Sequence, residues 1–252
     1  MKLEKVSAGY GQRVVVRDAS IDIQKGEIIC LIGPNGGGKS TLLKSINGTL
    51  GIKGGNIFLG KRDLSQLSAK EIAKELSIVT TERIRPQLMT CKDIVMSGRL
   101  PFSGGFGRYG REDEEIAHRS METMKVDKLA DTSYESLSDG QKQRTLIARA
   151  ICQSPRVLVM DEPTSYMDIK HRLELMEVVR QMAASEVTVI MSLHEIELAL
   201  GVADRLLLVY DDGHVLVKTP AEVIENSMIQ ELYGLDDAMY QKIEGTLTLW
   251  SR

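Results

Sequence analysis

Runs of apolar residues alternate along the chain with segments in which apolar residues recur every three or four positions. Three of the runs, at residues 28–32, 156–160 and 187–191, are short and almost wholly apolar. Such runs are typical of strands that are buried on both faces of a parallel sheet. The periodic segments predict helices at residues 41–47, 68–75, 141–151, 170–184 and 194–200. Strands that alternate with helices indicate an α/β fold whose mainly parallel sheet is covered on each side.

The start of the chain and a middle region depart from this alternation. Residues 2–23 contain short β-like pieces interrupted by a Gly-Tyr-Gly turn, which predicts an N-terminal antiparallel β part. Residues from 81 to about 155 mix prolines and a glycine-rich run with helical segments, one of them at 111–124, which predicts an inserted helical subdomain. Further strands are predicted at residues 56–59, 77–80, 205–210 and 214–217. The predicted organisation is one domain, residues 1–235, with an α/β core of residues 1–80 and 156–235, a helical subdomain of about 81–155, and a C-terminal tail of 236–252.

The segment after the first buried strand carries the most specific motif of the chain. Its sequence is Gly33-Pro34-Asn35-Gly36-Gly37-Gly38-Lys39-Ser40-Thr41, a match to G-x-x-x-x-G-K-[ST] between a strand and a helix. The glycines let backbone N–H groups point inward around a phosphate, and the following helix adds its dipole. Lys39 can reach the β- and γ-phosphates, and Ser40 can ligate Mg²⁺. The motif therefore predicts that residues 33–41 bind a nucleoside triphosphate.

A pair of acidic residues follows the second buried strand. Asp161 stands at the carboxyl end of residues 156–160, where nucleotides bind in α/β sheets. Beside a phosphate-binding loop, Asp161 is a candidate ligand of Mg²⁺, and Glu162 is a candidate general base that orients the attacking water. Taken alone, this sequence would fit two solvated acidic residues at a strand end equally well. Their pairing with the phosphate-binding loop favours a catalytic role.

A third motif lies upstream of the acidic pair. The run Leu137-Ser138-Asp139-Gly140-Gln141 is similar to the LSGGQ signature of the ATP-binding cassette family. The chain resembles this family from about residue 3 to residue 233. Tyr10 matches the aromatic residue that stacks on adenine, although its local sequence fits a buried strand residue equally well. Asp168 matches the D-loop aspartate, and His194 matches the switch histidine.

The resemblance implies an ATPase that works as a head-to-tail pair of identical copies. Each copy's P-loop would hold MgATP, and its catalytic residues would be Lys39, Glu162 and His194. Each signature, from Ser138 through Asp139 and Gly140 to Gln141, would close on the γ-phosphate held by the partner copy. The implied metal ligands are Ser40 and Asp161.

Two positions depart from the family pattern. The family usually has a glutamine after the strand that enters the helical subdomain, and here Thr81 and Glu82 occupy that place. We expect one of them to contact the water shell of Mg²⁺. Asp139 stands where glycine is common. A carboxylate there would repel a phosphate, so we expect its side chain to point away.

The segment Gly98-Arg99-Leu100-Pro101-Phe102 is similar to the G-R-x-P segment of importers for iron–siderophore complexes, haem and cobalamin. In that branch the ATPase is a separate chain at the cytoplasmic face of the membrane. It docks through its helical subdomain onto an integral membrane permease, which receives cargo from an extracytoplasmic binding protein. The resemblance favours iron–siderophore cargo over cobalamin or haem. Taken alone, the segment is also typical of a helix end followed by a turn.

Composition narrows the alternatives. The net charge of −3 argues against a nucleic-acid partner, because such proteins usually carry a basic face. The three cysteines show no metal-binding spacing and are predicted to be core thiols. No leader-like N-terminus or membrane-spanning run is apparent. A soluble cassette ATPase that clamps nucleic acid or ribosomes, and a P-loop kinase, remain as rival hypotheses.

Overall fold

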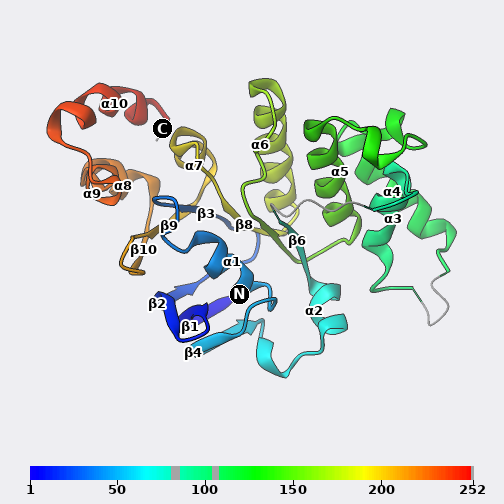
Figure 1. Ribbon diagram of the computed structural model, residues 1–252, viewed down its shortest axis with the longest axis horizontal. Helices are drawn as coiled ribbons and strands as arrows, with labels where there is room; N and C mark the ends of the chain where they lie inside the picture. Colours follow the sequence, from blue (N-terminus) through cyan, green and yellow to red (C-terminus); the bar gives the residue numbers. More distant parts are fainter. Residues whose placement is uncertain (81–85, 104–107, 251–252) are drawn as a thin grey trace.

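The computed structural model describes residues 1–80, 86–103 and 108–250, and its centre is a six-stranded sheet (Figure 1). The strand order is β10-β9-β3-β8-β7-β6. All neighbours are parallel except β9 and β10, which pair antiparallel. The strands are β3 Ile28–Ile32, β6 Leu76–Val79, β7 Val157–Met160, β8 Thr188–Ser192, β9 Arg205–Val209 and β10 Val215–Lys218. The predicted α/β fold with a mainly parallel sheet is confirmed.

A second, antiparallel sheet forms the N-terminal part, as predicted, with the order β2-β1-β4-β5. Its strands are β1 Lys2–Tyr10, β2 Arg13–Asp22, β4 Ile52–Leu59 and β5 Arg62–Asp63. The strand predicted at 56–59 is too short, because β4 already begins at Ile52. The first half of β4 contains Lys53 and two glycines, so it lacks the alternation of apolar and polar residues that predicts a strand. Gly55 has a φ of +79°, and a Cβ there would lie 2.2 Å from the carbonyl oxygen of Lys5, so a glycine is required where β4 shifts register against β1.

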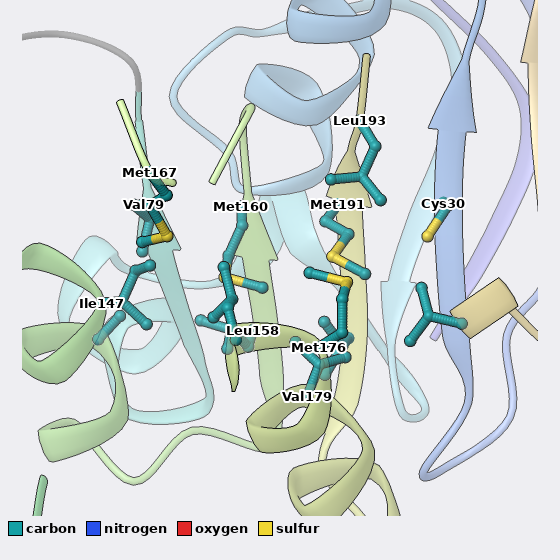
Figure 2. Packing of buried hydrophobic residues seen from close by; sticks show 14 of the residues in the cluster. Cys30, Val79, Ile147, Leu158, Met160, Met167, Met176, Val179, Met191 and Leu193 are labelled. Atoms are coloured by element: carbon teal, nitrogen blue, oxygen red, sulfur yellow. The ribbon is translucent and has the colours of Figure 1, made fainter. Parts of the chain in front are cut away.

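Side chains of β3 alternate between two cores, which makes this strand a rigid base for the loop that follows it. Ile29 and Leu31 pack in one core with α1, Lys39–Ile46, and with the antiparallel sheet. Cys30 packs in the other core. Helix α6, Ile169–Ala184, covers that face, where Figure 2 shows its buried side chains over the methionines of β7 and β8. Each such side chain contributes roughly 1.5–3 kcal/mol by leaving water.

The helical part lies to one side of the central sheet (Figure 1). Its helices are α3 Cys91–Met96, α4 Arg111–Thr123 and α5 Asp139–Cys152, with 3₁₀ turns at Ser97–Arg99, Asp127–Leu129 and Tyr134–Ser136. Capping boxes begin α3 at Thr90 and α5 at Ser138, which explains where these helices start. The helix predicted at 111–124 corresponds to α4. Helix α2, Ala69–Glu75, precedes β6 and begins with a capping box at Ser68.

Arg99 ties this helical part together from the inside. Its side chain is 9% exposed, and its Nε donates to Oδ1 of Asp113 at 2.8 Å, which lowers the pKa of that carboxyl. Its Nη1 donates to the carbonyl oxygen of Cys152 at 3.0 Å. Gly98 is needed beside it, since a Cβ would lie 2.3 Å from the carbonyl oxygen of Arg149. The helix-end interpretation of this segment is thus confirmed, because α3 ends at Met96.

Replacing Arg99 with methionine should destabilise the helical part by about 2–3 kcal/mol, because it leaves the buried carbonyl oxygen of Cys152 without its donor and removes the cation that pairs with Asp113. For a chain of this size we expect the melting temperature to fall by roughly 5–10 °C in thermal denaturation at pH 7. Arg111→Met is the matched control, since the Arg111 side chain is 93% exposed. Equal melting temperatures for the two variants would contradict the structural role of Arg99.

The C-terminal segment is helical. It comprises α8 Pro220–Glu225, α9 Met228–Tyr233 and α10 Asp237–Trp250. Residues 236–252 were predicted as a tail, yet α10 buries Tyr240 and Leu247 against the core that contains α7, Ile196–Val202. Across the residues that the structure describes, no helix combines the length and apolarity that a membrane crossing requires.

Candidate active site

The predicted motifs meet at one edge of the central sheet. The glycine-rich loop follows β3, the acidic pair follows β7 and His194 follows β8. These three strands are parallel neighbours in the order β3-β8-β7, so their carboxyl ends lie together. This edge is where open α/β sheets bind ligands.

The glycine-rich loop is shaped by glycines that no other residue can replace. Gly33 has a φ of +147°, and a Cβ there would lie 2.1 Å from the carbonyl oxygen of Val209 on β9. Gly38, with a φ of +111°, packs against side chains of β2, and a Cβ would lie 2.9 Å from Val16. The loop therefore follows the sheet surface closely before α1 begins at Lys39.

Lys39 lies inside this loop. Its Nζ donates to the carbonyl oxygens of Gly33 at 2.7 Å and Pro34 at 2.9 Å. Burial lowers the pKa of Lys39, and the nearby negative charges of Glu162 and Asp161 oppose that shift. The ammonium group is thus held at the sheet edge between loop carbonyls and the acidic pair.

Ser192, the last residue of β8, joins the two acids. Its hydroxyl donates to Oδ1 of Asp161 at 2.7 Å and accepts from the backbone N–H of Glu162 at 2.8 Å. Sequence reasoning missed Ser192, whose only signal is a polar side chain at the end of an apolar strand. Asp161 is buried, and Ser40 is the second residue of α1, the helix after the loop. Their oxygens are ligands that suit a hard cation such as Mg²⁺.

No group of three or more His, Cys, Asp or Glu residues in the described part of the chain is arranged to hold a metal ion. A cation at Ser40 and Asp161 would accordingly need further oxygens. Mg²⁺ commonly takes these from substrate phosphates and water, so this sparse donor set fits it.

Glu162 and His194 are in direct contact. Nε2 of His194 lies 2.6 Å from Oε1 of Glu162. Glu162 adopts a φ of +47°, a left-handed conformation that costs a non-glycine residue about 1–3 kcal/mol. This backbone conformation belongs to the turn that directs the chain away from β7 just after Asp161. Both side chains are partly exposed, so they can be reached from solvent.

Tyr10 stands at the end of β1 with 51% of its surface exposed. The buried-strand alternative is therefore wrong, and the stacking role remains a prediction. The turn after it leads to a hollow beside the glycine-rich loop. That hollow is lined in part by Arg13, Gly36 and Asp211.

The signature-like run begins α5 in the helical part, away from α1 in Figure 1. Ser138 is the N-cap: its hydroxyl accepts from the N–H of Gln141 at 3.3 Å, and the Gln141 side chain accepts from the N–H of Ser138 at 2.8 Å. Ser138 and Asp139 are exposed. Gly140 lies so close to the next loop that a Cβ would be 3.0 Å from the carbonyl oxygen of Tyr166.

That next loop, residues 163–168, ends at Asp168, the N-cap of α6. Oδ1 of Asp168 accepts from the N–H of His171 at 2.9 Å, and this bond is the main cause of the lowered pKa of Asp168. From α5, Gln143 Nε2 donates to the carbonyl oxygen of Pro163 at 3.3 Å. Thr81 and Glu82 lie outside the described residues, so their predicted role stays a prediction.

Comparison with known proteins decides the family. A profile described as ABC transporter matches residues 16–165. The chain belongs to the ABC transporter family. It is 40% identical, over 99% of its length and 86% of the relative, to an uncharacterized ABC transporter ATP-binding protein of Methanocaldococcus jannaschii. It is 35% identical, over 92% of its length and 85% of the relative, to the "Probable siderophore transport system ATP-binding protein YusV" of Bacillus subtilis.

The fold of this ABC transporter subunit matches solved cassettes as well. The crystal structure of a nucleotide-free ATP-binding cassette from an ABC transporter superposes with a TM-score of 0.78 at 26% identity, covering 90% of this chain and 94% of the other. The resemblance predicted from the motifs is thus confirmed. The chain is an ATP-binding subunit of the ABC transporter family and an ATPase that works in transport.

Proposed function

We propose that this chain is the ATP-hydrolysing subunit of an importer for iron–siderophore complexes. The observation that carries the proposal is its likeness, over nearly the whole chain, to the protein of Bacillus subtilis named "Probable siderophore transport system ATP-binding protein YusV". In this proposal the subunit lies at the cytoplasmic face of the membrane. It docks through its helical part onto an integral membrane permease, which takes its cargo from an extracytoplasmic binding protein.

Two copies bind two MgATP in a head-to-tail pair. The N–H groups of residues 35–41 hold the phosphates, and Lys39 exchanges its bonds with the carbonyls of Gly33 and Pro34 for phosphate oxygens. Tyr10 supports the adenine. Mg²⁺ at Ser40 and Asp161 would neutralise charge on the phosphate oxygens when bound.

Glu162 orients the attacking water and accepts its proton. His194 donates to the γ-phosphate, which requires it to leave Glu162, its partner at 2.6 Å here. Nucleotide binding therefore frees the carboxylate for water. Asp168, exposed at the start of α6, faces the partner copy in this arrangement.

The signature of each copy completes the site of the other. Ser138 and the N–H groups at the start of α5 bind the partner's γ-phosphate, since a helix N-terminus favours an anion. Asp139 at the first helical position would repel that phosphate unless its carboxylate turns aside. Closure of the pair on ATP and its opening after hydrolysis supply the motion that the permease uses.

Reconstitution tests the proposal. The tagged chain is isolated with the permease that co-purifies from its own cell membrane, and the complex is placed in vesicles. We expect ATP-dependent uptake of radiolabelled ferric siderophore with the binding protein present, and none with the Glu162→Gln complex. Uptake of cobalamin or haem without uptake of ferric siderophore would overturn the assignment of the cargo. Co-purification with nucleic acid and without a permease would overturn the transport role.

A further inference from the structure

A carboxylate outside the family motifs holds the loop that joins Glu162 to α6. Glu195 follows His194 and occupies the N-cap position of α7, but its side chain does not cap that helix. Instead, Oε2 accepts a hydrogen bond from the hydroxyl of Thr164 at 2.9 Å. Its Oε1 lies 2.9 Å from Nη1 of Arg172.

Arg172 extends this link to the far end of the loop. Its Nε donates to the carbonyl oxygen of Met167 at 2.9 Å, although Arg172 itself belongs to the first turns of α6. Thr164 is 2% exposed, so its hydroxyl depends on a protein partner. Glu195 thus fixes both the start and the end of residues 163–168, and charge-assisted bonds of this kind are the strong ones.

From the other side, α5 holds the same loop. Gln143 donates to the carbonyl oxygen of Pro163, and Gly140 lies against the backbone of Tyr166. The loop is therefore clamped between the helix that carries the signature and the residue next to His194. A backbone shift at His194 would therefore carry Glu195, and with it the loop.

We infer that Glu195 is a positioning residue, which keeps residues 163–168 and His194 in a fixed relation so that they move as one on nucleotide binding. The inference rests on the proposed roles of Glu162 and His194. Glu195 contacts neither candidate catalytic side chain in this arrangement; it acts through Thr164 and Arg172. Its loss should affect turnover and leave nucleotide binding intact, because a misplacement of about 1 Å can cost up to about a hundredfold in rate.

Glu195→Gln tests this directly, since the amide keeps the size but cannot accept from both donors. We expect kcat for ATP hydrolysis to fall about tenfold, while KM and the Kd of a fluorescent ATP analogue stay within about twofold of wild type. Glu197→Gln, on the same helix, is the matched control and should leave all three values unchanged. An unchanged kcat in Glu195→Gln, or a parallel loss of affinity, would overturn the inference.

A double-mutant cycle with Arg172→Gln tests whether the effect of Glu195 on kcat passes through its ion pair with Arg172. If the two residues act through one link, the double variant loses no more kcat than the worse single variant. Additive losses would overturn the link. Should Glu195→Gln fail to fold, Arg172→Lys replaces it, because it keeps the charge but loses the Nε donor. A wild-type protein without ATPase activity would refute the proposed function. Failure of the proposed function can therefore be told apart from failure of the inference about Glu195.

Discussion

The Glu162→Gln variant should bind ATP as tightly as the wild type and hydrolyse it about a thousandfold more slowly, because a general base contributes typically that much. Glutamine keeps the size of the side chain and its reach toward His194, which lies 2.6 Å away. It cannot accept the proton of the attacking water. Steady-state phosphate release measures the rate, and equilibrium dialysis with ATP measures binding.

A glutamate-to-glutamine substitution outside the candidate site shows whether the loss of activity is specific to the carboxylate of Glu162. Glu186 also has a left-handed backbone conformation, with a φ of +66°, and it pairs with Lys25 instead of facing the candidate site. Glu186→Gln therefore makes the same change of charge and shape at a comparable backbone position, and it should leave turnover unchanged. Glu162→Gln with more than about a tenth of wild-type activity would remove Glu162 as the general base.

The edge on which this site stands was predictable from local signals. A strand, a glycine-rich loop and a helix follow one another at residues 28–46, and the acidic pair follows another buried strand. Parallel neighbouring strands end at the same edge, so two motifs far apart in sequence must meet there. The fold class and family followed from the same residues.

The hydrogen-bond network around these motifs was not predictable. The bond from Thr164 to Glu195 and the bond from Ser192 to Asp161 each span 31 positions, and no periodicity encodes such a pairing. The positive φ of Glu162 has no sequence signal either, because glycine is the residue that usually marks it. These features arise only when β7 and β8 are placed side by side.

Other differences come from patterns that were present but weak. Tyr240, Ile243 and Leu247 recur at helical spacing, and Asp236 caps the helix by accepting from the N–H of Met239 at 2.8 Å, yet the segment was predicted only as a tail. Burial against the core, and not propensity, makes α10 a helix. The expectation that Thr81 or Glu82 takes the place of the usual glutamine stays a prediction.

Two inactive variants should restore ATPase activity to one another when mixed, and this result would test whether the sites are shared between copies. Lys39→Ala removes the ammonium group that is proposed to bind the phosphates, and Ser138→Arg blocks the start of α5. Each variant alone should lack activity in both sites of its pair. In a head-to-tail pair, one copy of each leaves one site with an intact Lys39 and an intact partner Ser138.

An equal mixture should therefore recover about a quarter of wild-type turnover, because half of the pairs are mixed and each mixed pair holds one complete site. The control places both changes in one chain and mixes it with wild type. Those mixed pairs hold no complete site if the signature acts across the pair, and one complete site if it acts within its own chain. Loss of the Ser138 cap costs only about 1 kcal/mol, so both variants should stay folded. No recovery in the first mixture, together with active mixed pairs in the control, would show that each copy completes its own site and would refute the shared arrangement.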